Sequence, residues 1–136
     1  MSDRYSRIMV PVDGSLPSID AFKKAVHISK RNQAEIYLVT ILEKTRDKEE
    51  AAYQQRNKEE LHLALENYAE KENVKISKNI RIGNAKQLIA EELVKEWNIN
   101  LIVIGATGKG RIAKMVLGSV TNHVTRYAAC DVLIVK

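Results

Sequence analysis

A glycine-rich segment from Gly105 to Ser119 has the residue spacing that points most directly to chemistry. Glycines stand at positions 105, 108 and 118, and a serine follows the last one, which gives the pattern G-x2-G-x9-G-S. The segment follows the apolar run Leu101–Ile104 and precedes a helical pattern. Glycines let a backbone come close to an anion, and a helix N-terminus offers unpaired N–H groups and a partial positive charge. The position of the segment therefore favours a bound phosphate over glycines that only make turns.

This segment differs from two common phosphate-binding loops. The Walker A pattern G-x4-G-K-[ST] fails because Arg111 stands where lysine is required, and G-x-G-x-x-G does not follow the first predicted strand. The basic side chains of Lys109, Arg111 and Lys114 suit a triphosphate. A solvated loop explains them equally well.

Asp13 is the second candidate, directly after the apolar run Ile8–Val12. A carboxylate at the end of a strand suits a ribose hydroxyl, an adenine amine or a metal ion. The structural alternative is an N-cap or an Asx turn, and both roles are compatible in one residue. With the glycine segment in the same chain, we favour contact with a ligand.

The histidines and the cysteine form no recognisable reactive arrangement. His27, His62 and His123 lack metal-ligand spacing, and no Ser-His-Asp set is present. We expect His27 and His62 on helix surfaces or flanks. His123 lies one turn into the helix after the glycine segment, and a structural role is favoured there over a phosphate contact. Cys130, the only cysteine, is interpreted as a small buried hydrophobic residue.

Strands and helices that alternate along the chain must position these candidates. Continuous apolar runs predict buried strands, and apolar residues three and four apart predict helices. Ser15 and Asn84 are predicted N-caps, and Ser119 is a candidate cap. We expect strands at 8–12, 35–42, 74–82, 101–104 and 132–135, and helices at 16–30, ending near 71, from 85 to about 98, and at 119–128. The apolar side of the second helix is predicted to be Leu61, Ala64, Leu65, Tyr68 and Ala69.

This alternation predicts a single α/β domain over residues 1–136. Its core is expected to be an open five-stranded parallel sheet with helices on both faces, in the strand order 3-2-1-4-5. In such sheets a ligand lies at the carboxyl ends of the strands, where the strand order reverses. Asp13 and Gly105 follow the first and fourth strands, so we expect them to be neighbours.

Composition argues against two classes of partner. The net charge of +5 comes from 22 basic and 17 acidic residues that are interleaved, and aromatic residues make up only 5%. A nucleic-acid surface would cluster its cations and offer aromatic rings for stacking. No apolar run approaches the roughly 20 residues of a membrane span, and the N-terminal residues lack the apolar part of a signal peptide. We therefore expect no nucleic acid, no membrane and a cytoplasmic location.

The chain resembles the universal stress protein family over essentially its whole length. The resemblance rests on Val10–Ser15, on the G-x2-G-x9-G-S pattern and on Cys130–Val135. In that family the glycine pattern marks the ATP-binding branch, and every fixed position of it is present here. Family members often have Ser-His between the first two glycines. Ala106-Thr107 stands there in this chain, which keeps the backbone contacts and lacks the imidazole.

The resemblance implies a Rossmann-like fold and an ATP-binding, homodimeric module for stress sensing or signalling. Asp13 and the backbone of Pro11 and Val12 would line the adenine and ribose site, and Ile41 would contact adenine through its backbone. Mg²⁺ would be held mainly by phosphates and water. Ribose and phosphates would lie on Gly105, Ala106, Thr107, Gly108, Lys109, Gly110 and Arg111, and phosphates also on Gly118, Ser119, Val120 and Thr121. ATP, AMP and cyclic AMP would share the adenosine contacts.

Two other functions stay open at this point. A slow ATPase or a related nucleotide-hydrolysing enzyme is compatible with the fold, and Asp13 is its only candidate base. A nucleotide-independent interaction protein is the other, and the intact glycine spacing argues against it. An apolar strand at a sheet edge exposes unpaired backbone groups, and the resemblance implies that two copies pair there. The residues of this expected dimer contact are Val132, Leu133, Ile134 and Val135.

Overall fold

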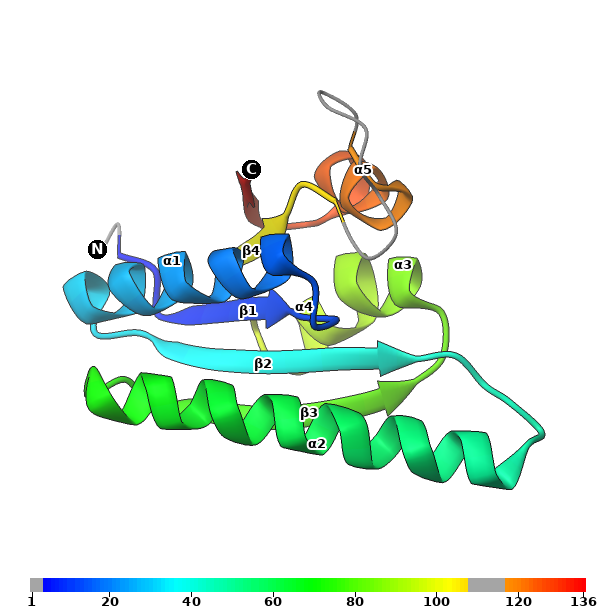
Figure 1. The fold of residues 1–136 in the computed structure, drawn as a ribbon. Coiled ribbons are helices and arrows are strands. Elements are labelled where there is room, and N and C mark those ends of the chain that lie inside the picture. The colour runs from blue at the N-terminus through cyan, green and yellow to red at the C-terminus, as the bar shows by residue number, and fades with distance from the viewer. Residues whose placement is uncertain (1–3, 108–116) are drawn as a thin grey trace.

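In a computed structural model of the chain, the described residues are 4–107 and 117–136, and they form one sheet with helices around it (Figure 1). The strands are β1 (Arg7–Pro11), β2 (Glu35–Leu42), β3 (Ile76–Ile82), β4 (Leu101–Gly105) and β5 (Asp131–Val135). The helices are α1 (Leu16–Asn32), α2 (Lys48–Lys71), α3 (Ala85–Gln87), the π-helical segment η1 (Leu88–Glu92), α4 (Leu93–Glu96) and α5 (Ser119–Tyr127). Five residues named above lie outside the described ranges: Gly108, Lys109, Gly110, Arg111 and Lys114.

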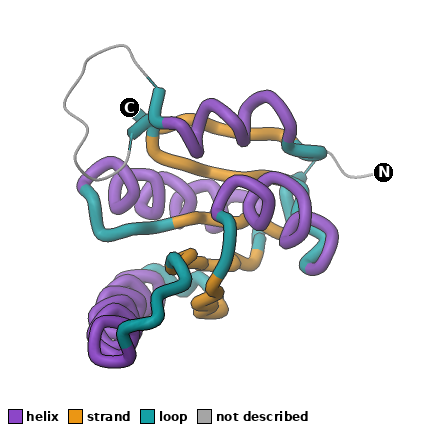
Figure 2. The backbone as a smooth tube through the Cα atoms, turned by 90° about the vertical axis from the view of Figure 1, so that its right-hand side faces the viewer, coloured by secondary structure: helices purple, strands orange, loops and turns teal. Residues whose placement is uncertain are grey.

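The sheet confirms the predicted topology. Its order is β3-β2-β1-β4-β5, and each neighbouring pair is parallel. The order reverses between β1 and β4, because the chain first builds outward from β1 to β3 and then returns to the other side of β1. This reversal separates the loops that leave the two strands and opens space at their carboxyl ends. Those ends of β1, β2 and β3 point to the right in Figure 1 and toward the viewer in Figure 2.

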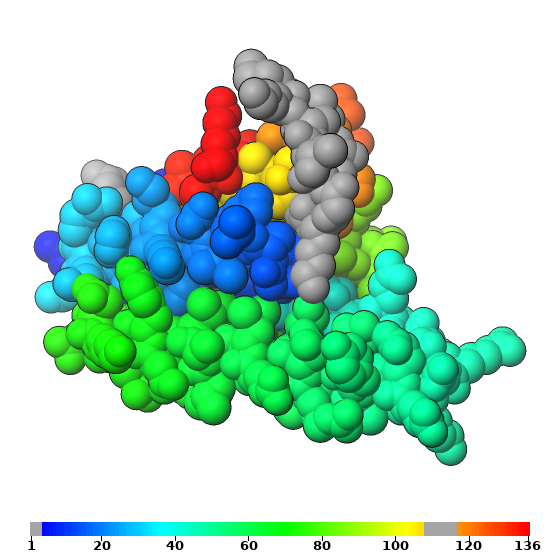
Figure 3. All heavy atoms as spheres, in the orientation of Figure 1, coloured from blue at the N-terminus to red at the C-terminus, as the bar shows by residue number. Residues whose placement is uncertain are grey.

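Helices cover both faces of the sheet, as predicted (Figure 2). The helices α1 and α2 pack on one face and occupy the side turned to the viewer in Figure 3, in blue and green. The opposite face holds η1, α4 and α5. Strand residues alternate between the two cores, because successive side chains of a strand point to opposite faces. In β1, for example, Ile8 and Val10 belong to the first core and Met9 to the second.

The helix starts follow local side-chain chemistry. The Ser15 hydroxyl caps α1 by accepting the Ser18 N–H at 3.3 Å, and the Asn84 side chain caps α3 by accepting the Gln87 N–H at 3.1 Å. Both caps were predicted. The helix α5 differs from the prediction, because Gly118 is its N-cap and Ser119 is already the first helical residue. The single helix expected up to about Asn98 ends at Glu96 and contains the π segment.

The buried side of α2 agrees with the prediction in part, since Leu61, Leu65, Tyr68 and Ala69 pack in or against the core. Its buried residues are Lys58, His62, Leu65 and Ala69, whereas Ala64 is exposed. The expectation that His62 lies on the helix surface is therefore wrong. The physical reason is that two polar side chains of the buried stripe find hydrogen-bond partners at the end of the sheet. None of the helices within the described ranges is both long and apolar enough to cross a membrane.

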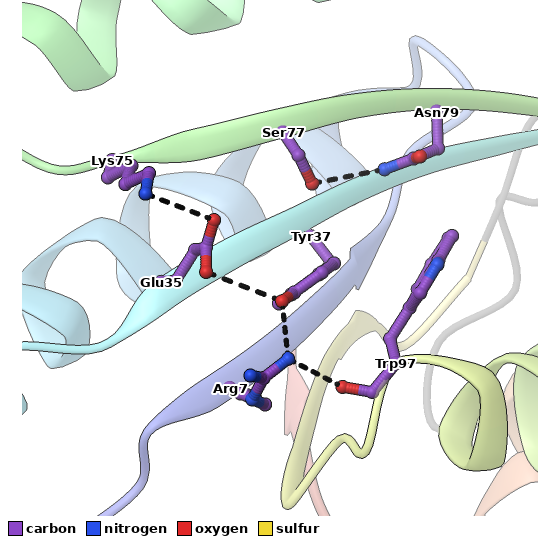
Figure 4. A network of polar contacts seen from close by, with 7 residues as sticks. All are labelled: Arg7, Glu35, Tyr37, Lys75, Ser77, Asn79 and Trp97. Carbon is purple, nitrogen blue, oxygen red and sulfur yellow. Dashed lines mark hydrogen bonds and ion pairs between the residues drawn. The ribbon is translucent and has the colours of Figure 1, made fainter.

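A polar and aromatic network lies toward the amino ends of the first three strands (Figure 4). The Arg7 guanidinium donates to the Tyr37 hydroxyl at 2.7 Å and to the Trp97 carbonyl at 3.2 Å. The rings of Tyr37 and Trp97 stack with centroids 5.4 Å apart, and Glu35 accepts from the Tyr37 hydroxyl at 3.3 Å. These contacts tie β1 and β2 to the end of α4. They lie at the opposite end of the strands from the space described next.

Candidate functional site

A cavity of about 410 Å³ opens at the carboxyl ends of β1 and β4. Ligand sites in proteins have volumes of about 300 to 1,000 Å³, so this cavity has the size of a small-molecule site. Within the described ranges, every residue predicted to bind the nucleotide lines the cavity, with Ala106 as the exception. They are Pro11, Val12, Asp13, Ile41, Gly105, Thr107, Gly118, Ser119, Val120 and Thr121.

Five further lining residues were missed from the sequence: Ser18, Val39, Ala85, Ile89 and Ile104. One of them, Val39, carried a usable signal in the sequence. Val39 lies two residues before Ile41 on β2, so the alternation of a strand places both on one face. Ala85 and Ile89 are four residues apart at the start of a helical region, but only the folded chain brings that region to the cavity.

The cavity has an apolar wall and a polar rim. Val39, Ile89 and Ile104 are buried residues of the core on the η1 face, so the wall is part of a packed core. Polar groups come from Asp13, Ser18, Thr107, Ser119 and Thr121. A flat apolar ring with a polar, charged substituent fits this division.

Each polar group of the Asp13 main chain is bonded, and so is one oxygen of its carboxylate. Its N–H donates to the Ser18 hydroxyl at 3.3 Å, and its carbonyl accepts from Lys58 Nζ at 3.0 Å. Its Oδ1 accepts the Ser15 N–H at 2.9 Å, which closes an Asx turn in which Gly14 has the left-handed φ of 91°. The Asx turn that was the structural alternative is thus present, and the same residue also lines the cavity.

A buried histidine lies behind the end of β1. The Thr40 hydroxyl donates to the Val12 carbonyl at 2.8 Å and is 2.7 Å from His62 Nε2. Because a hydroxyl has one hydrogen, Nε2 must carry the proton and donate to Thr40 Oγ1. Burial, together with the cations Lys78 and Lys58, lowers the pKa of His62 from 6.5 to about 4. His62 is therefore neutral at pH 7.

The end of β4 is built mainly from backbone contacts. A Cβ atom on Gly105 would lie 2.8 Å from the carbonyl carbon of Pro17, so only glycine fits against the first turn of α1. The Ala106 N–H donates to the Val135 carbonyl, and the Gly118 N–H donates to the Ala106 carbonyl, both at 2.8 Å. The Thr121 hydroxyl donates to the Gly105 carbonyl at 2.7 Å.

The first turn of α5 faces this end of the cavity. Ser119, Val120 and Thr121 all line it, and the N–H groups of a first helical turn have no partner within their own helix. No side chain of the described residues caps α5. This turn can therefore donate to an anion in the cavity.

Three further residues considered in the sequence, His27, His123 and Cys130, are not among the residues that line the cavity. His27 is exposed, and the His123 ring packs on Tyr127 with centroids 4.7 Å apart. Cys130 is half-buried, and burial and the charge of Asp131 raise the pKa of its thiol to about 11, as suits a hydrophobic role. Within residues 4–107 and 117–136 no group of three or more His, Cys, Asp or Glu could hold a metal ion.

Comparison with known proteins identifies relatives along the whole chain. The model of the universal stress protein family matches residues 4–136. A protein of Staphylococcus haemolyticus assigned to the universal stress proteins is 30% identical, with 97% of this chain and 85% of the relative covered. A Staphylococcus aureus protein with the same assignment is 31% identical, with 97% and 84% covered.

Solved structures of universal stress proteins share the fold of this chain. The universal stress protein UspA from Lactobacillus plantarum has a TM-score of 0.85 at 24% identity and covers 99% of this chain and 100% of its own. A universal stress protein in complex with cAMP has a TM-score of 0.72 at 26% identity, with 98% of both chains covered. Another, from Archaeoglobus fulgidus, is in complex with dAMP, with a TM-score of 0.75 at 20% identity and 97% and 98% covered. The family match over residues 4–136 and the shared fold establish that this chain belongs to the universal stress protein family.

Proposed function

We propose that this chain binds an adenine nucleotide, ATP in particular, in the cavity between β1 and β4. The observation that carries the proposal is the division of the cavity into an apolar wall and a rim that holds Asp13 and the first turn of α5. The wall suits the base, Asp13 suits a ribose hydroxyl or the adenine amine, and the helix turn suits phosphate. Two universal stress proteins with this fold have been solved in complex with cAMP and with dAMP. These ligands share the adenine base with ATP.

Mg²⁺ would accompany the nucleotide. Mg²⁺ keeps several waters and is usually held by one or two carboxylates and by substrate phosphates. Asp13 is the one carboxylate among the described residues that line the cavity. The triphosphate and water would therefore supply most of the ligands. The proposal is for a site that holds the nucleotide, and the alternative of slow hydrolysis would depend on Asp13, the candidate base that lines the cavity.

The proposed role is that of a homodimeric module for stress sensing or signalling in the cytoplasm. The dimer contact would be β5, which is an edge strand whose central Leu133 is 37% exposed. Pairing of two β5 strands would satisfy the backbone groups of both edges. Leu133→Asp should shift a dimer toward monomer in sedimentation, because it places two like charges in that contact. An unchanged sedimentation coefficient at micromolar concentration would contradict this part of the proposal.

Nucleotide binding is tested by filling the cavity. Ala85→Trp places an indole against the apolar wall, and Ala52→Trp adds the same group at an exposed position of α2 as the matched control. Titration calorimetry with Mg-ATP, AMP and cAMP should show at least a roughly 100-fold loss for Ala85→Trp and no change for Ala52→Trp. Equal affinities for both variants would contradict the assigned cavity. Mass spectrometry of nucleotide released from the purified protein would identify the resident ligand.

A further inference from the structure

The helix α2 contacts the ends of the strands from the side opposite the apolar wall. No described residue of α2 lines the cavity. Buried residues of α2 pack into the core on one face of the sheet, together with α1, while the apolar wall of the cavity belongs to the core on the η1 face. Even so, two side chains one helical turn apart, Lys58 and His62, are buried at the ends of β1 and β2.

Lys58 is 6% exposed and donates from Nζ to the Asp13 carbonyl at 3.0 Å. Burying an ammonium group is costly unless its hydrogen bonds are made, so a position of this kind holds its acceptor firmly. The peptide that follows Asp13 is thereby fixed from the α2 side. The Asx turn fixes the Asp13 carboxylate from the α1 side.

His62 supports the preceding residue by the same principle. It is 2% exposed and donates from Nε2 to Thr40 Oγ1, and Thr40 donates in turn to the Val12 carbonyl. Lys58 and His62 therefore hold two consecutive carbonyls, those of Asp13 and Val12. Both of these residues line the cavity.

We propose that Lys58 and His62 are positioning residues of the adenosine site, acting through Asp13 and Val12 without touching the ligand. This inference rests on the proposed function, because it assigns the adenosine contacts to Val12 and Asp13. The consequence for binding is preorganisation. With both carbonyls held, the Asp13 carboxylate need not be reoriented when the ribose or adenine enters, and the affinity is correspondingly higher.

A double-mutant cycle tests this action through Asp13. The variants are Lys58→Met, Asp13→Ala and the double variant. Lys58→Met keeps the length of the side chain and removes its hydrogen-bond donor. Mg-ATP affinity is measured by calorimetry, and unfolding midpoints are recorded for each variant. Lys58→Met should weaken binding roughly 10-fold in the natural chain and less than about twofold in the Asp13→Ala background. Lys71→Met, at an exposed position of the same helix, should leave the affinity unchanged.

A second pair of variants keeps the test informative if Lys58→Met does not fold. His62→Gln retains a donor at the position of Nε2, whereas His62→Leu removes it. Affinity should be within about threefold of the natural chain for His62→Gln and roughly 10-fold weaker for His62→Leu. A purely structural role would change the unfolding midpoint without this difference in affinity.

The outcomes separate the two proposals. Equal losses from Lys58→Met in both backgrounds, or unchanged affinity in Lys58→Met and His62→Leu, would overturn the positioning role and leave the nucleotide site in place. Absence of any adenine-nucleotide binding by the natural chain would overturn both. A loss confined to the background with Asp13 would support the inference.

Discussion

The two strand ends that meet at the cavity are built by different means. The end of β1 is held by side chains from three other elements: Ser18 of α1, Thr40 of β2 and Lys58 of α2. The end of β4 is held mainly by backbone bonds from Ala106 and Gly118 and by close packing of Gly105, with one side-chain bond from Thr121. The stability of the β1 end should therefore depend mainly on buried polar side chains, and that of the β4 end mainly on the small volume of Gly105.

This contrast has a functional meaning under the proposed function. A side chain that must face a sugar or base needs a fixed backbone behind it, and buried hydrogen bonds supply that at β1. Phosphate oxygens need N–H groups and close approach, and glycine with an open helix turn supplies those at β4. Substitutions at the two strand ends should therefore destabilise the protein by different mechanisms.

The largest effect is expected from Gly105→Val. Its Cβ would come within 2.8 Å of the Pro17 carbonyl carbon and 2.9 Å of its oxygen, and backbone atoms cannot move aside cheaply. We expect a loss of about 3 kcal/mol in the free energy of unfolding, measured in urea, which is the upper end of the usual cost of overpacking. Ala129→Val, at an exposed position, is the control and should change stability by less than about 0.5 kcal/mol. Unchanged stability of Gly105→Val would mean that the first turn of α1 shifts to accept it. Because Gly105→Val is expected to lower stability, a loss of nucleotide binding in this variant would reflect misfolding as well as a lost ligand contact.

An acid-dependent loss of stability is the next largest expectation, and it belongs to the β1 end alone. The folded pKa of His62 is about 4 and its ordinary value is 6.5, so the unfolded chain binds a proton more readily over this range. The free energy of unfolding therefore does not depend on His62 well above pH 6.5. It should fall by about 3 kcal/mol as the pH is lowered to 4, because protonation of His62 favours the unfolded chain. Urea unfolding at several pH values should show this slope in the natural chain and a shallower one in His62→Gln. Parallel slopes in the two chains would contradict a buried neutral His62.

Two isosteric changes measure the contrast directly. Thr40→Val leaves the buried His62 Nε2 and the Val12 carbonyl without their partner, and we expect a cost of about 2 kcal/mol. Thr121→Val removes one bond to the Gly105 carbonyl at the β4 end, with an expected cost of about 1 kcal/mol. Thermal and urea unfolding of both variants check the order. A larger loss for Thr121→Val would show that the β4 end is the more dependent on side-chain bonds.

Much of the fold was predictable because its signals are local. The strand Glu35–Leu42 was predicted with its observed bounds, and the caps Ser15 and Asn84 were predicted from residue type and local spacing. The positions of Asp13 and Gly105 after the first and fourth strands also predicted that they would meet. Each of these depends on alternation, capping chemistry or the rule for parallel sheets, which operate over short stretches of chain.

The errors arose where distant parts of the chain decide. Lys58 and His62 are polar, so the helical pattern predicted an apolar side through Ala64 instead. Their burial depends on the carbonyls at the end of β1, more than 40 residues earlier in the chain in the case of Lys58 and Asp13. The cap of α5 was misplaced by one residue, since serine is the stronger cap by type while Gly118 is tied to Ala106.

By itself the sequence determined the alternation of strands and helices, the family and the residues grouped around the carboxyl ends of β1 and β4. Only the tertiary structure decided that Gly105 packs on Pro17, that Ala85 and Ile89 complete the apolar wall, and that Lys58 of α2 donates to the Asp13 carbonyl. The physical reason is the distance along the chain over which each interaction acts. Periodicity and capping depend on neighbouring residues, whereas a buried lysine or histidine needs hydrogen-bond partners that only the folded sheet brings close.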